Sequence, residues 1–167
     1  MKSVRTPGVL LVLAASLAVI GCGKKEEPKA AAPAPAPVAA PAPAPKPELV
    51  VKIGHVAPLT GPIAHLGKDN ENGARLAVDD ANAKKIEIDG KVIKFELLGE
   101  DDQADPKTGT VVAQKLVDAK VAGVVGHLNS GTTIPASAIY NAAGLPQISP
   151  SATNPKYTQQ GFNTAFR

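Results

Sequence analysis

Residues 121–144 read VAGVVGHLNSGTTIPASAIYNAAG, and this stretch decides the fold. Its first five residues are short, apolar and mostly β-branched, which is typical of a strand buried on both faces. Residues 134–144 predict a helix, with Pro135 in its first turn, where a missing N–H costs least, and Gly144 at its end. The polar residues 129–133 therefore lie where free N–H groups and the helix dipole favour an anion.

The same polar residues have a simpler interpretation. In this interpretation, Ser130, Thr132 and Thr133 cap the helix that follows and bind no ligand. A ligand site at this place requires other strand ends to converge on it, because open α/β sheets bind ligands in the crevice at the carboxyl ends of their strands. The remaining elements of the chain therefore decide between the two interpretations.

Strands and helices alternate along the chain after residue 48. Strands are predicted at 49–57, 91–98, 121–125 and 145–148, and helices at 67–83, from Asp105-Pro106 onward and at 134–144, with an Asp89-Gly90 hairpin turn. This alternation predicts an α/β fold with a doubly wound parallel sheet and right-handed crossovers. The expected strand order is second, first, third, fourth. Three strand ends then contribute residues 60–67, 129–133 and 151–153 to one crevice.

The amino terminus has the pattern of a secretory signal. Lys2 and Arg5 precede an apolar run at residues 9–20, which is too short for a membrane span. The run ends at Cys22, the one cysteine of the chain, in a sequence that resembles the lipobox of bacterial lipoproteins. We interpret residues 1–21 as a lipoprotein signal peptide and Cys22 as the lipidated residue. The alternative is an ordinary signal peptide with a free cysteine.

Residues 22–47 predict a stalk. From Pro28 to Pro47 the chain is almost only proline and alanine, a composition that cannot bury a core and favours extended polyproline II. At about 3.1 Å per residue such a segment can reach roughly 60 Å. The globular part is therefore expected to begin at residue 48 and to include residues 48–167.

The net charge of +3 is unevenly distributed. Residues 1–47 hold six Lys and Arg against two Glu, whereas residues 48–167 hold twelve Lys and Arg against thirteen Asp and Glu. The globular part is thus slightly acidic, which argues against a nucleic-acid-binding face. An aromatic content of 3% also disfavours base stacking.

Other functional patterns are weak in this sequence. Carboxylates at Glu100, Asp101, Asp102 and Asp105 can hold Mg²⁺ or accept a phosphoryl group, but a solvated turn with Asp105 as a helix cap is the better interpretation. His127 is expected to be a hydrogen-bonded structural residue, and we identify no acidic residue that would orient it toward a nucleophile. We therefore predict no metal, no cofactor and no enzymatic activity.

A family resemblance rests on five motifs that keep their spacing. They are VAPLTGP at 56–62, Gly73-Ala74, DDQADP at 101–106, GHLNS at 126–130 and ISPSAT at 148–153. Together they resemble the branched-chain amino-acid binding proteins of bacterial ABC importers, which are type I periplasmic binding proteins. That family has two lobes joined by hinge strands. By this resemblance, residues 48–167 are the first part of the amino-terminal lobe of a longer protein.

The resemblance implies a ligand site for an amino acid. The serine matching Ser130 and the threonine matching Thr153 bind the α-carboxylate and the α-ammonium in the family, with the backbone at Ser151. The predicted ligand-binding set is Ser130, Thr153, Ser151, Ala152, Asn129 and Leu66. Leu66 occupies the position where relatives often place a tyrosine against the ligand side chain.

The implied function is that of a substrate-binding lipoprotein. It captures an amino acid, with the branched-chain type favoured, in the periplasm and delivers it to the permease of an ABC importer. The lipid on Cys22 would anchor it to a bacterial membrane, and it would act as a monomer. The alternative is an envelope sensor or assembly-factor lipoprotein that reuses the same fold.

Overall fold

A computed structural model describes residues 44–167 of the chain. The predicted signal peptide, Cys22 and most of the predicted stalk lie outside these residues. The elements are β1 (Glu48–Ala57), α1 (Ala64–Ala83), β2 (Glu87–Ile88), β3 (Lys91–Asp101), α2 (Pro106–Asp118), β4 (Gly123–Gly126), α3 (Ser130–Ala142), β5 (Gln147–Ile148), η1 (Pro155–Tyr157) and β6 (Ala165–Phe166). Within the described part of the chain, no helix is long and apolar enough to cross a membrane.

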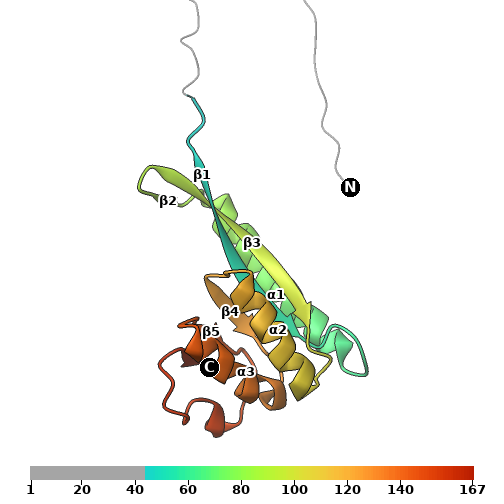
Figure 1. Ribbon diagram of the computed structural model, residues 1–167. Helices are drawn as coiled ribbons and strands as arrows, with labels where there is room; N and C mark the ends of the chain where they lie inside the picture. The colour runs from blue at the N-terminus through green and yellow to red at the C-terminus, as the bar shows by residue number, and fades with distance from the viewer. Residues whose placement is uncertain (1–43) are drawn as a thin grey trace, which may run out of the picture. The chain divides into compact units, whose positions relative to one another are not determined.

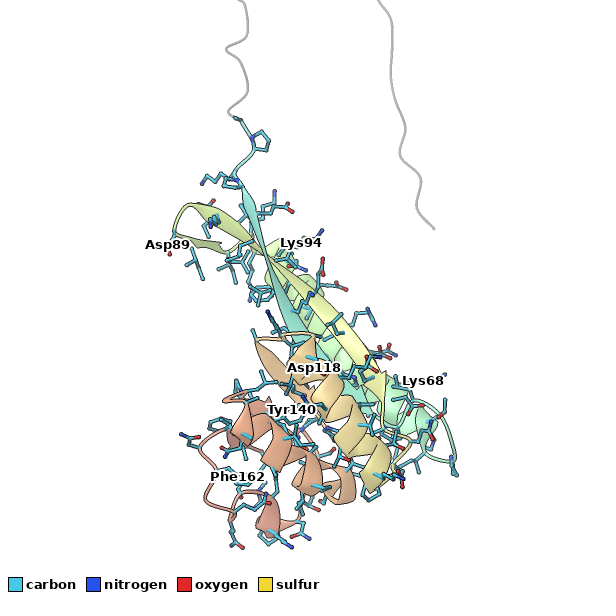
Figure 2. The ribbon with its side chains drawn as sticks, viewed as in Figure 1. Lys68, Asp89, Lys94, Asp118, Tyr140 and Phe162 are labelled. Carbon is cyan, nitrogen blue, oxygen red and sulfur yellow. The ribbon has the colours of Figure 1, made fainter. Side chains whose placement is uncertain are left out.

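The strands form one sheet in the order β2-β3-β1-β4-β5-β6. All neighbouring strands are parallel except β2 and β3, which form an antiparallel hairpin. The predicted α/β class and the parallel sheet are therefore confirmed. The predicted order of four strands is confirmed too, since they are β3, β1, β4 and β5 in the sheet. The hairpin turn is confirmed too, because Asp89 and Gly90 both have positive φ, as a type I′ turn requires. Figure 2 labels Asp89 at the tip of this hairpin.

One face of the sheet carries the hydrophobic core, where α2 and α3 lie side by side (Figure 1). Val56 of β1 and Val124 of β4 pack against Leu116 of α2 and Tyr140 of α3, and each of the four is almost completely buried. Burying a large apolar side chain contributes roughly 1.5–3 kcal/mol. This layer therefore holds β1 and β4 in place, together with the two turns that follow them.

The other face is only partly covered, because α1 packs on β1 and β3. Near its end, the Asn82 amide binds the Phe95 backbone twice: Nδ2 donates to the carbonyl (2.9 Å) and Oδ1 accepts from the N–H (2.8 Å). Past the two-residue β2, these Phe95 groups face the outer edge of β3 and would otherwise lack partners. The Asn82 amide thus replaces a missing strand at this edge.

Beside α1 the sheet is open. An apolar groove of about 590 Å³ runs between α1 and the sheet, and Ala77, Phe95 and Val125 are among its lining residues. On the same side of the sheet, Ile148 and Phe166 are about half exposed. The prediction that the strand before Gly126 is buried on both faces is therefore wrong. Only its Val124 face is fully packed, since no helix within residues 44–167 closes over Val125, which lines this groove.

Helix α3 differs from its prediction at the amino end. It begins at Ser130 with Asn129 as the N-cap residue, so Pro135 lies inside the helix and not in its first turn. The carbonyl of Asn129 accepts the N–H groups of Thr132 (3.1 Å) and Thr133 (2.9 Å), which starts the helix four residues early. The proline is tolerated at the cost of the one hydrogen bond that its missing N–H would have given to Gly131.

Two glycines of α1 should respond in opposite ways to the same substitution. At Gly67 a Cβ would lie 2.0 Å from the carbonyl oxygen of Pro58, so Gly67→Ala must push the helix away from the preceding turn. Overpacking of this kind costs about 1–3 kcal/mol. At Gly73 nothing lies within 4 Å of the added Cβ, and Gly73→Ala should stabilise by about 0.5–1 kcal/mol.

Thermal unfolding of both variants tests this packing. We expect the midpoint to fall for Gly67→Ala and to rise for Gly73→Ala, relative to the parent protein. Equal midpoints for the two variants would contradict the close approach of α1 to Pro58.

Candidate functional site

The carboxyl ends of β1, β3, β4 and β5 meet at one edge of the sheet, as parallel strands require. Two of the turns at this edge are joined directly. We call residues 127–130 the first loop and residues 149–154 the second loop. The Ser149 hydroxyl donates to the carbonyl of His127 (2.7 Å), and the Ser151 hydroxyl donates to the carbonyl of Leu128 (2.7 Å). These bonds bring together two of the three predicted segments of the crevice.

Ser130 closes the contact between the two loops and is also the first residue of α3. Its Oγ accepts the backbone N–H of Asn154 (3.2 Å), which leaves the proton of the hydroxyl available for another acceptor. Among residues 44–167, the N–H groups of Ser130 and Gly131 have no acceptor. Ser130 is therefore not an N-cap, and its position combines an O–H with two free N–H groups at the positive end of a helix dipole.

Asn129 and Ala152 are two further residues of the predicted site, one in each loop. Asn129 is the N-cap residue, but its side chain makes no capping bond, and its Oδ1 is buried without a partner among the described residues. Ala152 is 3% exposed, and its N–H donates to Ser149 Oγ (3.0 Å). The structure thus brings Ser130, Asn129, Ser151 and Ala152 into one connected unit.

Thr153 lies on the exposed part of the second loop. Its carbonyl accepts a hydrogen bond from the Arg167 guanidinium (2.8 Å), which ties the loop to the residue that follows β6. Its hydroxyl and N–H have no partner within the described part of the chain. Thr153 thus keeps a donor and a hydroxyl unpaired within residues 44–167, one residue before Asn154, whose N–H binds Ser130.

The third predicted segment, which holds Leu66, is fixed by a different residue. Leu66 lies in the first turn of α1 and is 48% exposed. The turn before α1 is held by Asp101, whose carboxylate accepts from the Leu59 N–H (2.8 Å), from the Thr60 hydroxyl and from the Gln103 N–H (2.9 Å). No described contact joins Leu66 to the first or second loop, so its part in the site stays a prediction.

A buried polar chain under the first loop was missed from the sequence. His127 Nδ1 lies 2.9 Å from Asp102 Oδ2, and Nε2 lies 3.1 Å from the hydroxyl of Tyr140. All three side chains are fully buried. The prediction that His127 is a hydrogen-bonded structural residue is confirmed. The statement that no acidic residue orients it is wrong, because Asp102 does so from the end of β3.

This geometry does not activate a serine. Both ring nitrogens of His127 are occupied, and Ser130 Oγ contacts Asn154 instead. The pairing of Asp102 with His127 joins positions 25 residues apart. The usable signal was topological: β3 and β4 both flank β1, so an acid after one and a histidine after the other can meet.

The acidic cluster matches its expected solvated turn only in part, because Asp102 is fully buried against His127. Asp105 caps α2 by accepting the Thr108 N–H (2.7 Å), as predicted. Glu100 pairs with Lys115 on α2 (2.7 Å). Within residues 44–167, no three His, Cys, Asp or Glu side chains gather as a metal site would need.

The chain is similar to proteins of one kind. A family model described as "Periplasmic binding protein" matches residues 50–166. The leucine-specific-binding protein of Salmonella typhimurium is 42% identical over 117 residues, which are 70% of this chain and 31% of that protein. The Leu/Ile/Val-binding protein homolog 1 of Brucella abortus is 44% identical over 117 residues, with the same shares.

Solved structures agree with this similarity. The branched-chain amino acid transporter substrate-binding protein of Streptococcus pneumoniae, in complex with isoleucine, has a TM-score of 0.61 and 37% identity, and the match covers 68% of this chain and 32% of that one. These matches confirm the resemblance that the motifs carry. The chain spans about a third of the length of the curated relatives it matches.

The carboxylate of Asp101 should make the stability of the folded protein fall at low pH. Burial alone would raise the pKa of this carboxyl, but the hydrogen bonds from Thr60, Gln103 and Leu59 outweigh it and lower the pKa below its usual value. A lowered folded-state pKa contributes stability that is present above the unfolded pKa and is lost as the pH falls through the folded one. We expect Asp101→Asn to melt earlier than the parent protein at neutral pH and to match it at low pH.

Melting temperatures measured between pH 7 and pH 2 check this expectation. Asp79→Asn removes the same charge from the exposed surface of α1 and controls for net charge. A difference between Asp101→Asn and the parent protein that stays constant down to pH 2 would contradict the role given to the carboxylate.

Proposed function

The chain belongs to the periplasmic binding protein family, and from this premise we propose that it captures an amino acid, with branched-chain amino acids favoured, and delivers it to an ABC importer. In support, similar proteins are named for leucine, isoleucine and valine, and a similar structure holds isoleucine. We further propose that the protein works as a monomer in the periplasm, anchored by a lipid on Cys22.

The arrangement at Ser130 is the observation that carries this proposal. An α-carboxylate needs donors from several directions once water is excluded, because an unsatisfied buried charge is costly. Ser130 offers the free proton of its hydroxyl together with its own N–H, and the Gly131 N–H stands beside them. The positive end of α3 adds favourable charge for an anion at the same place.

The second loop supplies the groups that an α-ammonium needs. The Ser151 hydroxyl donates to the carbonyl of Leu128. The backbone carbonyl of Ser151 is then the group that can accept a hydrogen bond from the ammonium. Thr153 offers a hydroxyl to the ammonium and an N–H to the carboxylate. In this scheme Leu66, exposed at the start of α1, contacts the side chain of the ligand and sets the preferred size.

Removing the Ser130 hydroxyl tests the scheme. Hydrogen bonds to charged groups contribute about 1.5–3 kcal/mol, so Ser130→Ala should weaken amino-acid binding roughly ten- to a hundredfold. The measurement is calorimetric titration of the full-length gene product with leucine, isoleucine and valine, with the melting temperature recorded on the same samples.

Thr164→Ala is the matched control, because it removes one hydroxyl bond, to Asn141 Oδ1 (3.0 Å), that belongs to neither loop. We expect Thr164→Ala to lower the melting temperature while its affinity stays close to that of the parent protein. If Ser130→Ala melts earlier but binds as tightly as the parent, Ser130 serves the fold alone and the assigned site is wrong.

The membrane anchor has its own test. If Cys22 is acylated, cells supplied with radiolabelled palmitate should transfer the label to the parent protein and not to Cys22→Ala. The soluble fraction should contain the variant after the cells are broken. Label retained by Cys22→Ala would refute the anchor without bearing on the amino-acid site.

A further inference from the structure

His127 stands at the point where four parts of the fold meet. Its ring contacts Asp102, after β3, and Tyr140, on α3, and its own residue follows β4. Its carbonyl accepts from Ser149, after β5. Helix α2 comes close as well, since a Cβ on Gly109 would lie 3.6 Å from His127 Cε1. The ring is fully buried, and each of its two nitrogens has a partner on another element. Figure 2 labels Tyr140 on α3.

One arrangement of protons satisfies the whole chain of three side chains. Burial, with the nearby charge of Asp102, raises the pKa of Tyr140, so its phenol stays protonated and donates. Burial opposes ionisation of Asp102, but hydrogen bonds from His127 and the Ala104 N–H prevail and lower its pKa, so the carboxylate accepts. With the proton of the His127 ring on Nδ1 and a bare Nε2 that accepts the phenol, every polar atom of these contacts has a partner of the opposite kind.

The backbone of His127 connects this chain to the candidate site. Its carbonyl accepts the Ser149 hydroxyl (2.7 Å) and shares the Thr133 hydroxyl (3.0 Å) with the carbonyl of Asn129 (2.8 Å). Ser149 Oγ in turn accepts the N–H of Ala152 (3.0 Å), inside the second loop. A displacement of the His127 peptide therefore moves the first and second loops together, and with them Ser130 and Thr153.

We propose that Asp102, His127 and Tyr140 are positioning residues for amino-acid binding: they fix the tautomer and place of the His127 ring, so that its carbonyl holds both loops in register. This inference rests on the proposed function. None of the three side chains touches the ligand, since all are fully buried. They act through the spacing between Ser130 on one loop and Thr153 on the other.

The variant that isolates this role is Tyr140→Phe, which removes one oxygen and keeps the ring in the core. We expect amino-acid affinity to fall about two- to tenfold, the range that a neutral hydrogen bond supplies. The Nε2 of His127 should also lose its hydrogen-bonded ¹⁵N shift in long-range ¹H–¹⁵N spectra. Both measurements use the full-length gene product, with leucine, isoleucine and valine as the probes.

Tyr157→Phe is the matched control. Tyr157 is also fully buried, and its hydroxyl donates to a backbone carbonyl, that of Gln147 (3.0 Å), without contacting His127. We expect this variant to melt earlier than the parent protein while it binds amino acids with nearly the same affinity. The comparison separates the loss of a buried hydroxyl from the loss of the contact to His127.

Each outcome decides the proposal. Tyr140→Phe that melts earlier but binds as tightly as the parent overturns it, as does an equal loss of affinity in Tyr157→Phe. An Nε2–H tautomer or an imidazolium in the parent protein also overturns it, and this spectrum needs no variant to fold. A parent protein that binds none of the three amino acids refutes the proposed function and this inference with it, whereas a failure of the inference alone leaves parent binding intact.

Discussion

The carbonyl of His127 accepts two hydroxyl hydrogen bonds, and the carboxyl edge of the sheet depends on it. Through Thr133 it fixes the first turn of α3, and through Ser149 it fixes the loop after β5. Both donors are fully or almost fully buried, and Thr133 shares its one hydroxyl proton with the carbonyl of Asn129 (2.8 Å). Because a buried donor without an acceptor costs about 1–3 kcal/mol, the Ser149 hydroxyl holds the second loop to the His127 carbonyl.

Buried polar groups at this edge are therefore structural necessities that also shape the surface above them. Asp102, His127 and Tyr140 satisfy one another below the loops, while the hydroxyls of Ser149 and Ser151 face the backbone. Within residues 44–167, a small set of donors and acceptors around Ser130 and Thr153 remains without hydrogen-bond partners at the surface. Because the buried bonds hold the two loops against each other, these groups stay close together.

The two faces of the sheet differ in how completely they are packed. On one face α2 and α3 bury Val56 and Val124 of the sheet, whereas α1 packs on β1 and β3 on the other. The apolar strip beyond α1 includes Val125, Ile148 and Phe166. The candidate site lies at the carboxyl edge of the sheet, between the face covered by α2 and α3 and the face that α1 partly covers. The chain spans about a third of the length of the relatives it matches.

The sequence by itself determined the order of the elements and the class of the fold. Proline, glycine and the Asp89-Gly90 turn separate the segments, and short apolar strands between helices dictate a parallel sheet whose ends meet at one edge. It also determined which loops carry Ser130 and Thr153, and the family to which those motifs point. These features are local in the chain or follow from general rules of connection, so no tertiary contact was needed to predict them.

The tertiary structure alone decided how those loops are held. It placed Asn129, and not Ser130, at the N-cap, and so moved Pro135 into the helix, because carbonyl and N–H partners become available only when the turn is folded. It joined Asp102 to His127 across 25 residues and closed the edge of β3 with Asn82. Side-chain pairs of this kind depend on the distance between strands in the sheet, which a linear pattern of residues does not encode.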